Sequence, residues 1–137
     1  MRANEPKVFF EPGSVAVIGA SSNPTKRGHA VLKNLVEGCY SKRGIVYPIT
    51  PTAQEILGCR AYLSVLDLPD PIDLAATIVP HPFVPSVLRA CGQKGILAAI
   101  VITAGFREAG MAGVERQRDL VAMAKICRET IQQVWWT

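Results

Sequence analysis

Short, uninterrupted apolar runs alternate along the chain with segments whose apolar residues recur at every third or fourth position. The runs occupy residues 15–18, 45–49 and 96–102, and residues 73–79 form a similar segment that is apolar except for Asp73 and Thr77. Such runs are typical of strands buried on both faces of a parallel sheet. The periodic segments, typical of amphipathic helices, occupy residues 30–36, 83–94 and 111–128. The alternation predicts a single α/β domain with a Rossmann-like, doubly wound parallel sheet.

Glycine and proline separate these elements. Gly38 and Gly95 are placed to end two of the helices, and Pro48 indicates a strand near an edge of the sheet, because proline lacks an N–H. Residues 58–60 are expected to form a turn and residues 66–71 a loop. Residues 1–12 are a lead-in to the domain.

The final segment, residues 129–137, is an atypical end that contains Trp135 and Trp136 side by side. One interpretation is a last edge strand that packs its indole rings on the sheet. The alternative is an apolar surface that binds a partner or a second copy of the chain.

The turn after the first apolar run has the residues best suited to binding an anion. Gly19 ends the run, and Ala20, Ser21 and Ser22 follow it before the next helix. A strand, a turn of small residues and a helix together direct backbone N–H groups and a helix N-terminus at an anion. Serine hydroxyls add further donors. We therefore expect a ligand that carries phosphate at this turn.

A nicotinamide dinucleotide fits this turn less well. Its fingerprint, G-x-G-x-x-G, needs closely spaced glycines, whereas Gly19 and Gly28 are far apart here. An NAD site also places an acidic residue after the second strand, and this chain has Thr50 and Pro51 there. An NAD(P)-binding oxidoreductase fragment is therefore retained as an alternative.

The carboxyl ends of the predicted strands all carry small, polar or proline residues. They are residues 19–22, Thr50 with Pro51, Pro80 with His81, and residues 103–105. Ligands of open α/β sheets bind beyond these ends. His81 has no carboxylate near it in sequence to orient its ring, and His29 is expected on a helix surface, so no catalytic residue is assigned.

Composition narrows the class of protein. The chain has 137 residues, 49% hydrophobic and 19% charged, which is typical of one well-buried globular domain. The longest apolar run, residues 96–104, is far shorter than the roughly 20 residues of a membrane span. The N-terminus lacks the apolar core of a signal peptide. These features favour a cytoplasmic protein with no membrane partner.

The formal net charge is +4, and the positive residues occur as pairs, such as Lys26-Arg27, rather than as a stripe. This pattern favours a small anionic ligand over nucleic acid. The four cysteines show no C-x-x-C spacing, which favours reduced thiols over a metal site.

Six short segments, in order, carry a resemblance to a known family. They are Phe10-Glu11-Pro12, residues 14–21, residues 31–35, Tyr47-Pro48, residues 55–58 and residues 102–106. Together they closely resemble the N-terminal CoA-binding domain of ADP-forming acyl-CoA (acetyl-CoA) synthetases, to which the alpha subunit of succinyl-CoA synthetase is related. The resemblance covers roughly residues 8–124.

The resemblance implies CoA, or acyl-CoA, bound across the strand ends. It matches the phosphate-binding part of the family to Gly19, Ala20, Ser21, Ser22 and Lys26, and the lining of the path to Val79, Pro80, Thr103 and Ala104. With the strand-end residues Thr50, Pro51 and His81, these form the predicted cofactor site. Lys26 or Arg27 would neutralise part of the phosphate charge.

The chain departs from the family pattern in two places. Thr50-Pro51-Thr52 stands where Asn-Pro-Lys is frequent, and residues 131–137 stand where the family continues towards its phosphohistidine and ATP-grasp domains. We therefore expect a CoA-binding domain, stand-alone or part of a split ADP-forming acyl-CoA synthetase, without activity on its own. The remaining synthetase domains, on another chain, and a second copy are the expected partners. A regulatory module with weakened CoA binding is a further alternative.

Overall fold

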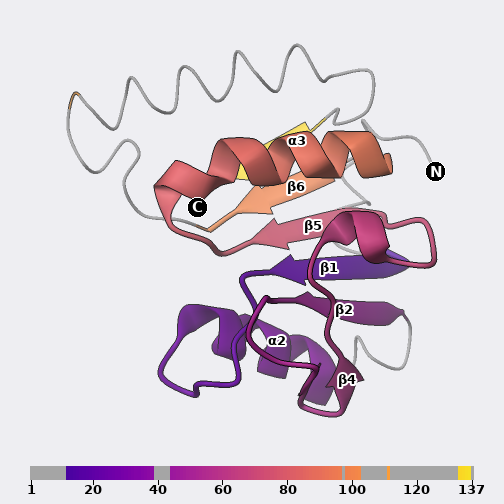
Figure 1. The fold of residues 1–137 in the computed structure, drawn as a ribbon, viewed down its shortest axis with the longest axis vertical. Helices are drawn as coiled ribbons and strands as arrows, with labels where there is room; N and C mark the ends of the chain where they lie inside the picture. Colours follow the sequence, from indigo (N-terminus) through magenta and orange to yellow (C-terminus); the bar gives the residue numbers. More distant parts are fainter. Residues whose placement is uncertain (1–11, 39–43, 97, 103–110, 112–132, 137) are drawn as a thin grey trace.

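The computed structural model of the chain describes residues 12–38, 44–96, 98–102, 111 and 133–136. Their main sheet has the strand order β2-β1-β5-β6-β7, and every neighbouring pair is parallel (Figure 1). The strands are β1 (Ser14–Ile18), β2 (Ile45–Ile49), β5 (Leu74–Thr77), β6 (Ala98–Val101) and β7 (Gln133–Trp136). The two longer described helices are α2 (Arg27–Glu37), after β1, and α3 (Val84–Lys94), after β5. The predicted Rossmann-like parallel sheet is confirmed.

Two hydrophobic cores lie on opposite faces of this sheet. In β1, Val15 and Val17 pack with Leu32 of α2, whereas Ala16 and Ile18 pack with Leu88 of α3. Successive side chains of a strand point to opposite faces, so an apolar residue is needed at every position of β1. This explains why the strand is a continuous apolar run and why one helix covers each face.

The two outer strands of the sheet contain Pro48 and the tryptophan pair, for which the sequence suggested edge positions. Pro48 lies in β2, an outer strand, and its carbonyl accepts a hydrogen bond from Tyr62 N–H at 3.0 Å. At the other edge, β7 pairs with β6 and includes Trp135 and Trp136. The edge-strand interpretation of these tryptophans is therefore confirmed for the backbone, and their side chains lie outside what the structure describes.

The helix boundaries are close to those predicted. Helix α2 begins at Arg27, three residues before the periodic segment, and α3 begins at Val84. Gly95 ends α3 in the left-handed conformation, with φ of +91°, whereas Gly38 ends α2 with extended backbone. Of the predicted helix at residues 111–128, all but Met111 lies outside the described residues.

The prediction of a turn at residues 58–60 is wrong for Cys59 and Arg60. These two residues form strand β4 (Cys59–Arg60), which pairs antiparallel with β3 (Glu55–Ile56). The turn consists of Leu57 and Gly58, which both have positive φ, at 52° and 79°. Two-residue hairpin turns favour this geometry because it matches the twist of the strands. A leucine such as Leu57 rarely adopts positive φ, so the sequence does not indicate this turn.

The described connections also contain two short 3-10 helices. They are η2 (Val65–Asp67), which overlaps the start of the predicted loop, and η3 (His81–Phe83), which leads directly into α3. Figure 1 shows α3 running along the sheet in front of β6. The path from β5 through η3 to α3 brings His81 to the carboxyl end of the sheet.

Two cysteines lie in the described part of the chain, and both are free thiols. Cys91 lies fully buried in the core on the α3 face, and this burial raises the pKa of its thiol to about 12. Such a thiol is inert in the folded protein because the reactive thiolate is disfavoured. Cys59 is partly exposed in β4, and burial raises the pKa of its thiol.

Tyr47 makes the stability of the fold sensitive to alkaline pH. Its hydroxyl donates a hydrogen bond of 2.7 Å to Asp70, and that bond, with burial, raises the pKa of Tyr47 from 10.0 to about 12. The protonated phenol is thus favoured by folding, so its contribution is complete below pH 10 and is lost as pH rises towards 12. We expect the stability difference between wild type and Tyr47→Phe to shrink over that range in urea unfolding. A difference that stays constant from pH 8 to 11.5 would contradict this assignment.

Thr77, the last residue of β5, has a buried hydroxyl without a hydrogen-bond partner among the described residues. Leaving such a group unpaired costs free energy, and valine has nearly the same shape. We expect Thr77→Val to raise the free energy of unfolding by about 1 kcal/mol. Thr77→Ala, which also removes a methyl group, is the control and should destabilise the domain. Equal destabilisation by both variants would mean that the hydroxyl is satisfied.

Candidate functional site

A cavity of about 540 Å³ opens at the carboxyl end of the sheet. Its lining comes from the segments that follow three adjacent strands, namely β1, β5 and β6: Gly19, Ser21, Lys26, Arg27, Gly28, Ile78, Val79, Pro80, His81 and Ile102. The chain leaves β1 to form α2 on one face and leaves β5 to form α3 on the other face. Ligands of doubly wound sheets bind where neighbouring connections diverge in this way. The cavity therefore occupies the position expected of a ligand site.

Two glycines allow the first loop to close against the sheet and against α2. Gly19 has φ of +93°, and a Cβ there would lie 2.0 Å from the carbonyl oxygen of Ile78. A Cβ on Gly28 would lie 1.9 Å from the carbonyl oxygen of Gly19. Both positions therefore require glycine. The first turn of α2 is held against the end of β1, so its N-terminus lies at the cavity.

The backbone of the loop already uses some of its donors. The N–H groups of Gly19 and Ala20 both donate to the carbonyl oxygen of Ile49, at 3.1 and 3.2 Å. These two groups fix the loop to the end of β2 rather than serving a ligand. This revises the expectation that the amides next to Gly19 hold phosphate.

Other donors are left for an anion. Ser21 Oγ accepts a hydrogen bond from Asn23 N–H at 3.0 Å, which leaves the hydroxyl proton of Ser21 available. Lys26 occupies the N-cap of α2 without a side-chain cap, so the N–H groups of Arg27 and Gly28 are available to a ligand or to water. Together these donors form an anion site at a helix N-terminus that borders the cavity.

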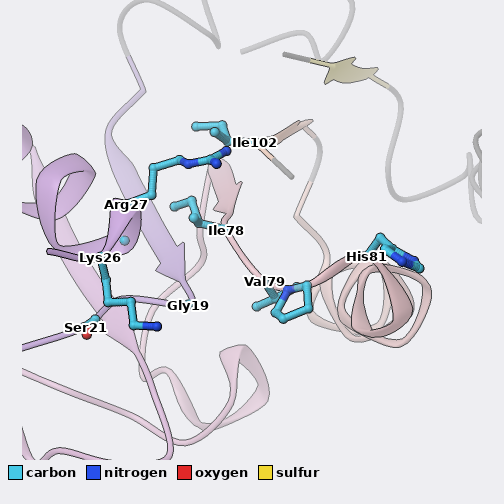
Figure 2. Close-up of a pocket in the computed structure, with 10 residues that line it drawn as sticks. Gly19, Ser21, Lys26, Arg27, Ile78, Val79, His81 and Ile102 are labelled. Atoms are coloured by element: carbon cyan, nitrogen blue, oxygen red, sulfur yellow. The ribbon is translucent and has the colours of Figure 1, made fainter. Parts of the chain in front are cut away.

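Positive charge lies on the same side of the cavity. Figure 2 shows Lys26 and Arg27 on the α2 side, and Val79 and His81 on the side that leads to α3. Both cationic side chains are exposed, so they can move to meet a ligand. The opposite side is mainly apolar, with Val79, which packs with the core on the α3 face, and Pro80. The site thus has a charged side and an apolar side.

The structure brings about half of the predicted cofactor residues together. Gly19, Ser21, Lys26, Val79, Pro80 and His81 all line the cavity. Ala20 is buried and packs in the core on the α2 face, and Ser22 is exposed next to the cavity lining. Thr103 and Ala104 lie outside the described residues.

Thr50 and Pro51 lie elsewhere at the same end of the sheet. Thr50 is buried, and its hydroxyl is 3.1 Å from the hydroxyl of Thr52. Pro51 lines a second cavity of about 410 Å³, with Thr52, Ala53, Gln54, Ala61, Tyr62 and Leu63. None of these lining side chains carries a charge. The second cavity is thus suited to an uncharged group rather than to phosphate.

Sequence reasoning missed three residues of the main cavity. Gly28 was noted only as too distant for the dinucleotide fingerprint, although its position in the first turn of a helix could have signalled close packing on the strand. Ile78 and Ile102 continue apolar runs past the ends of β5 and β6, and they line the cavity. Nothing in the sequence marks the residue at which a strand stops pairing.

Within the described segments, no three His, Cys, Asp or Glu residues are grouped so that they could hold a metal ion. None of the helices that the structure describes is long and apolar enough to span a membrane.

A Rossmann-like parallel sheet with a cavity at the divergence of β1 and β5 is typical of nucleotide-binding α/β domains. The family model of the CoA binding domain matches residues 13–132. The chain belongs to this family of CoA-binding domains.

Individual proteins that resemble the chain support its assignment to this family. The alpha subunit of the ADP-forming acetate–CoA ligase II of Pyrococcus furiosus is 44% identical over 116 residues, which are 85% of this chain and 25% of that subunit. An acetyl-coenzyme A synthetase of Candidatus Korarchaeum cryptofilum, solved with phosphate and ADP, has a TM-score of 0.83 and 41% identity, over 90% of this chain and 26% of that one. The chain is thus homologous to the CoA-binding domain of ADP-forming acyl-CoA synthetases. It spans about a quarter, or less, of the length of the ADP-forming acetate–CoA ligases that it matches.

A conserved hypothetical protein of Pyrococcus furiosus is similar to the chain over nearly its whole length. Its structure has a TM-score of 0.65 and 26% identity, over 89% of this chain and 91% of that one. A domain of this kind thus also occurs in a protein of about this size.

Proposed function

We propose that the chain binds CoA, or acyl-CoA, in the cavity between the ends of β1 and β5. The observation that carries the proposal is the division of this cavity. One side has Lys26, Arg27 and the N-terminus of α2, whereas the other has Val79 and Pro80. CoA has the same division, since its pyrophosphate is strongly charged and its pantetheine arm is long and weakly polar.

The charged side would receive the pyrophosphate. The Ser21 hydroxyl and the N–H groups of Arg27 and Gly28 would donate to phosphate oxygens, and the two cationic side chains would balance the charge. The apolar side would receive the pantetheine arm, with His81 at its edge. Val79, Pro80 and His81 are therefore proposed as contacts of the arm.

We further propose that the chain serves as the CoA-binding part of an ADP-forming acyl-CoA synthetase. This rests on its similarity to the alpha subunit of an acetate–CoA ligase. In this role the chain binds CoA and presents the thiol of CoA, and other domains activate the acyl group. The acyl group is not specified by the described residues. A cytoplasmic location and self-association stay predictions from the sequence.

A stand-alone CoA-binding protein is the second candidate. The similar protein of comparable size from Pyrococcus furiosus favours it. Both candidates need CoA binding and differ only in their partners. An NAD-binding fragment is disfavoured because the end of β2 carries the buried Thr50, without a carboxylate to hold ribose hydroxyls.

Calorimetric titration of the purified chain tests this proposal. We expect saturable heat with CoA at micromolar affinity and no heat with NAD at the same concentrations. Heat with NAD alone would contradict the proposal and favour the oxidoreductase alternative. Absence of heat with both ligands would also contradict it and would favour a regulatory module that has lost CoA binding.

A further inference from the structure

His29 links the two ends of the loop that borders the cavity. Its Nδ1 lies 2.9 Å from the carbonyl oxygen of Ser21, eight residues earlier in the chain. A carbonyl oxygen can only accept a hydrogen bond, so Nδ1 must carry the hydrogen. The side chain is half-buried in the first turn of α2. It therefore connects the helix N-terminus directly to Ser21, which lines the cavity.

This contact constrains the peptide between Ser21 and Ser22. The peptide group is planar and trans, so its C=O and N–H point in opposite directions. Holding the Ser21 carbonyl towards His29 therefore fixes the direction of the Ser22 N–H as well. It also fixes the Cα of Ser21, which lines the cavity.

The rest of the loop is held by different contacts. Asn23 Oδ1 accepts hydrogen bonds from the N–H and the hydroxyl of Thr25, at 3.0 and 2.8 Å, and Lys26 N–H donates to the carbonyl of Asn23. These bonds organise residues 23–26 among themselves. The His29 contact joins the Ser21 carbonyl to the helix.

We propose that His29 is a positioning residue that holds Ser21 and Ser22 in the phosphate-binding geometry before the ligand arrives. The inference rests on the proposed CoA site and deepens it. Without the imidazole, the Ser21–Ser22 peptide can rotate, and the ligand must then order it on binding. That ordering reduces affinity without changing the contacts in the complex.

Substitutions that mimic one ring nitrogen at a time test this role. The amide nitrogen of asparagine can take the position of Nδ1, whereas that of glutamine corresponds more closely to Nε2. We expect His29→Ala and His29→Gln to weaken CoA binding about fivefold to tenfold, the equivalent of one lost hydrogen bond. His29→Asn should stay within about twofold of wild type, because it keeps the donor. Asn34→Ala, further along the exposed side of α2, is the control and should bind normally.

A second readout separates this proposal from the proposed function. Long-range 15N spectra of the ligand-free protein should show hydrogen on Nδ1 of His29, and the NMR order parameter of the Ser22 amide should fall in His29→Ala but not in His29→Asn. These results can be obtained even if CoA does not bind, in which case only the proposed function fails. A neutral His29 with hydrogen on Nε2 alone would overturn the positioning role. So would a His29→Ala variant with wild-type affinity and a wild-type order parameter for the Ser22 amide.

Discussion

Gly28→Ala is expected to destabilise the domain by about 3 kcal/mol, the upper part of the usual range for overpacking. The new Cβ would lie 1.9 Å from the carbonyl oxygen of Gly19, 2.9 Å from its carbonyl carbon and 3.3 Å from the Cα of Ala20. All three atoms belong to the backbone, so no side chain can move aside. The loop at the end of β1 or the first turn of α2 must shift instead.

The direction of this effect opposes helix propensity. Gly28 lies in α2, where alanine would ordinarily stabilise an α-helix by up to about 1 kcal/mol relative to glycine. Urea unfolding of the variant measures the net result. Gly13→Ala is a suitable control, because its Cβ would meet only the end of the Asp73 side chain, at 3.0 Å. A Gly28→Ala variant as stable as wild type would show that α2 does not pack on Gly19 as described.

The double variant Lys26→Ala/Arg27→Ala is expected to bind CoA about 10-fold to 100-fold more weakly than wild type. Charge-assisted hydrogen bonds to phosphate can each contribute a few kcal/mol, and the exposure of both side chains reduces this value. The loss should be largest at low salt, because ions screen the attraction between exposed charges. The dependence of affinity on salt should therefore become flatter in the variant.

Lys33→Ala is the matched control for this experiment. Lys33 is an exposed residue of α2 that does not line the cavity, and its substitution removes the same type of charge. We expect an affinity within about threefold of wild type, the effect of a distant exposed charge. If the double variant and the control bind CoA equally well, with the same salt dependence, the phosphate does not lie at the N-terminus of α2.

The sheet was predictable from sequence because burial of a strand on both faces leaves a strong pattern. Residues 15–18 are apolar without interruption, and they form all of β1 except its first residue, between the two cores. Pro48 gave a similarly direct signal of an edge, since it cannot donate in a ladder. By contrast, the hairpin of β3 and β4 turns at Leu57, a residue that rarely adopts positive φ.

The candidate site was predictable as a region but not in its detail. The small residues after β1 indicated an anion site, and Ser21 and Lys26 do line the cavity. Which backbone donors are free depends on tertiary contacts, such as the bonds from Gly19 and Ala20 to Ile49. The same holds for His29, which the sequence places on a helix surface and which the structure shows bonded to Ser21. Thr50 and Pro51 were grouped with the site because all parallel strands end together, yet Pro51 lines the second cavity.

Two-dimensional 1H–15N NMR of the labelled chain during titration with CoA tests the central claim most directly. We predict saturable shifts for the amides of Gly19, Ser21, Arg27, Ile78 and Val79, which surround the cavity between β1 and β5. Amides on the far end of the sheet, such as that of Asp73, should not move. Shifts confined to the second cavity around Gln54 and Tyr62, or no shifts with CoA, would contradict the account.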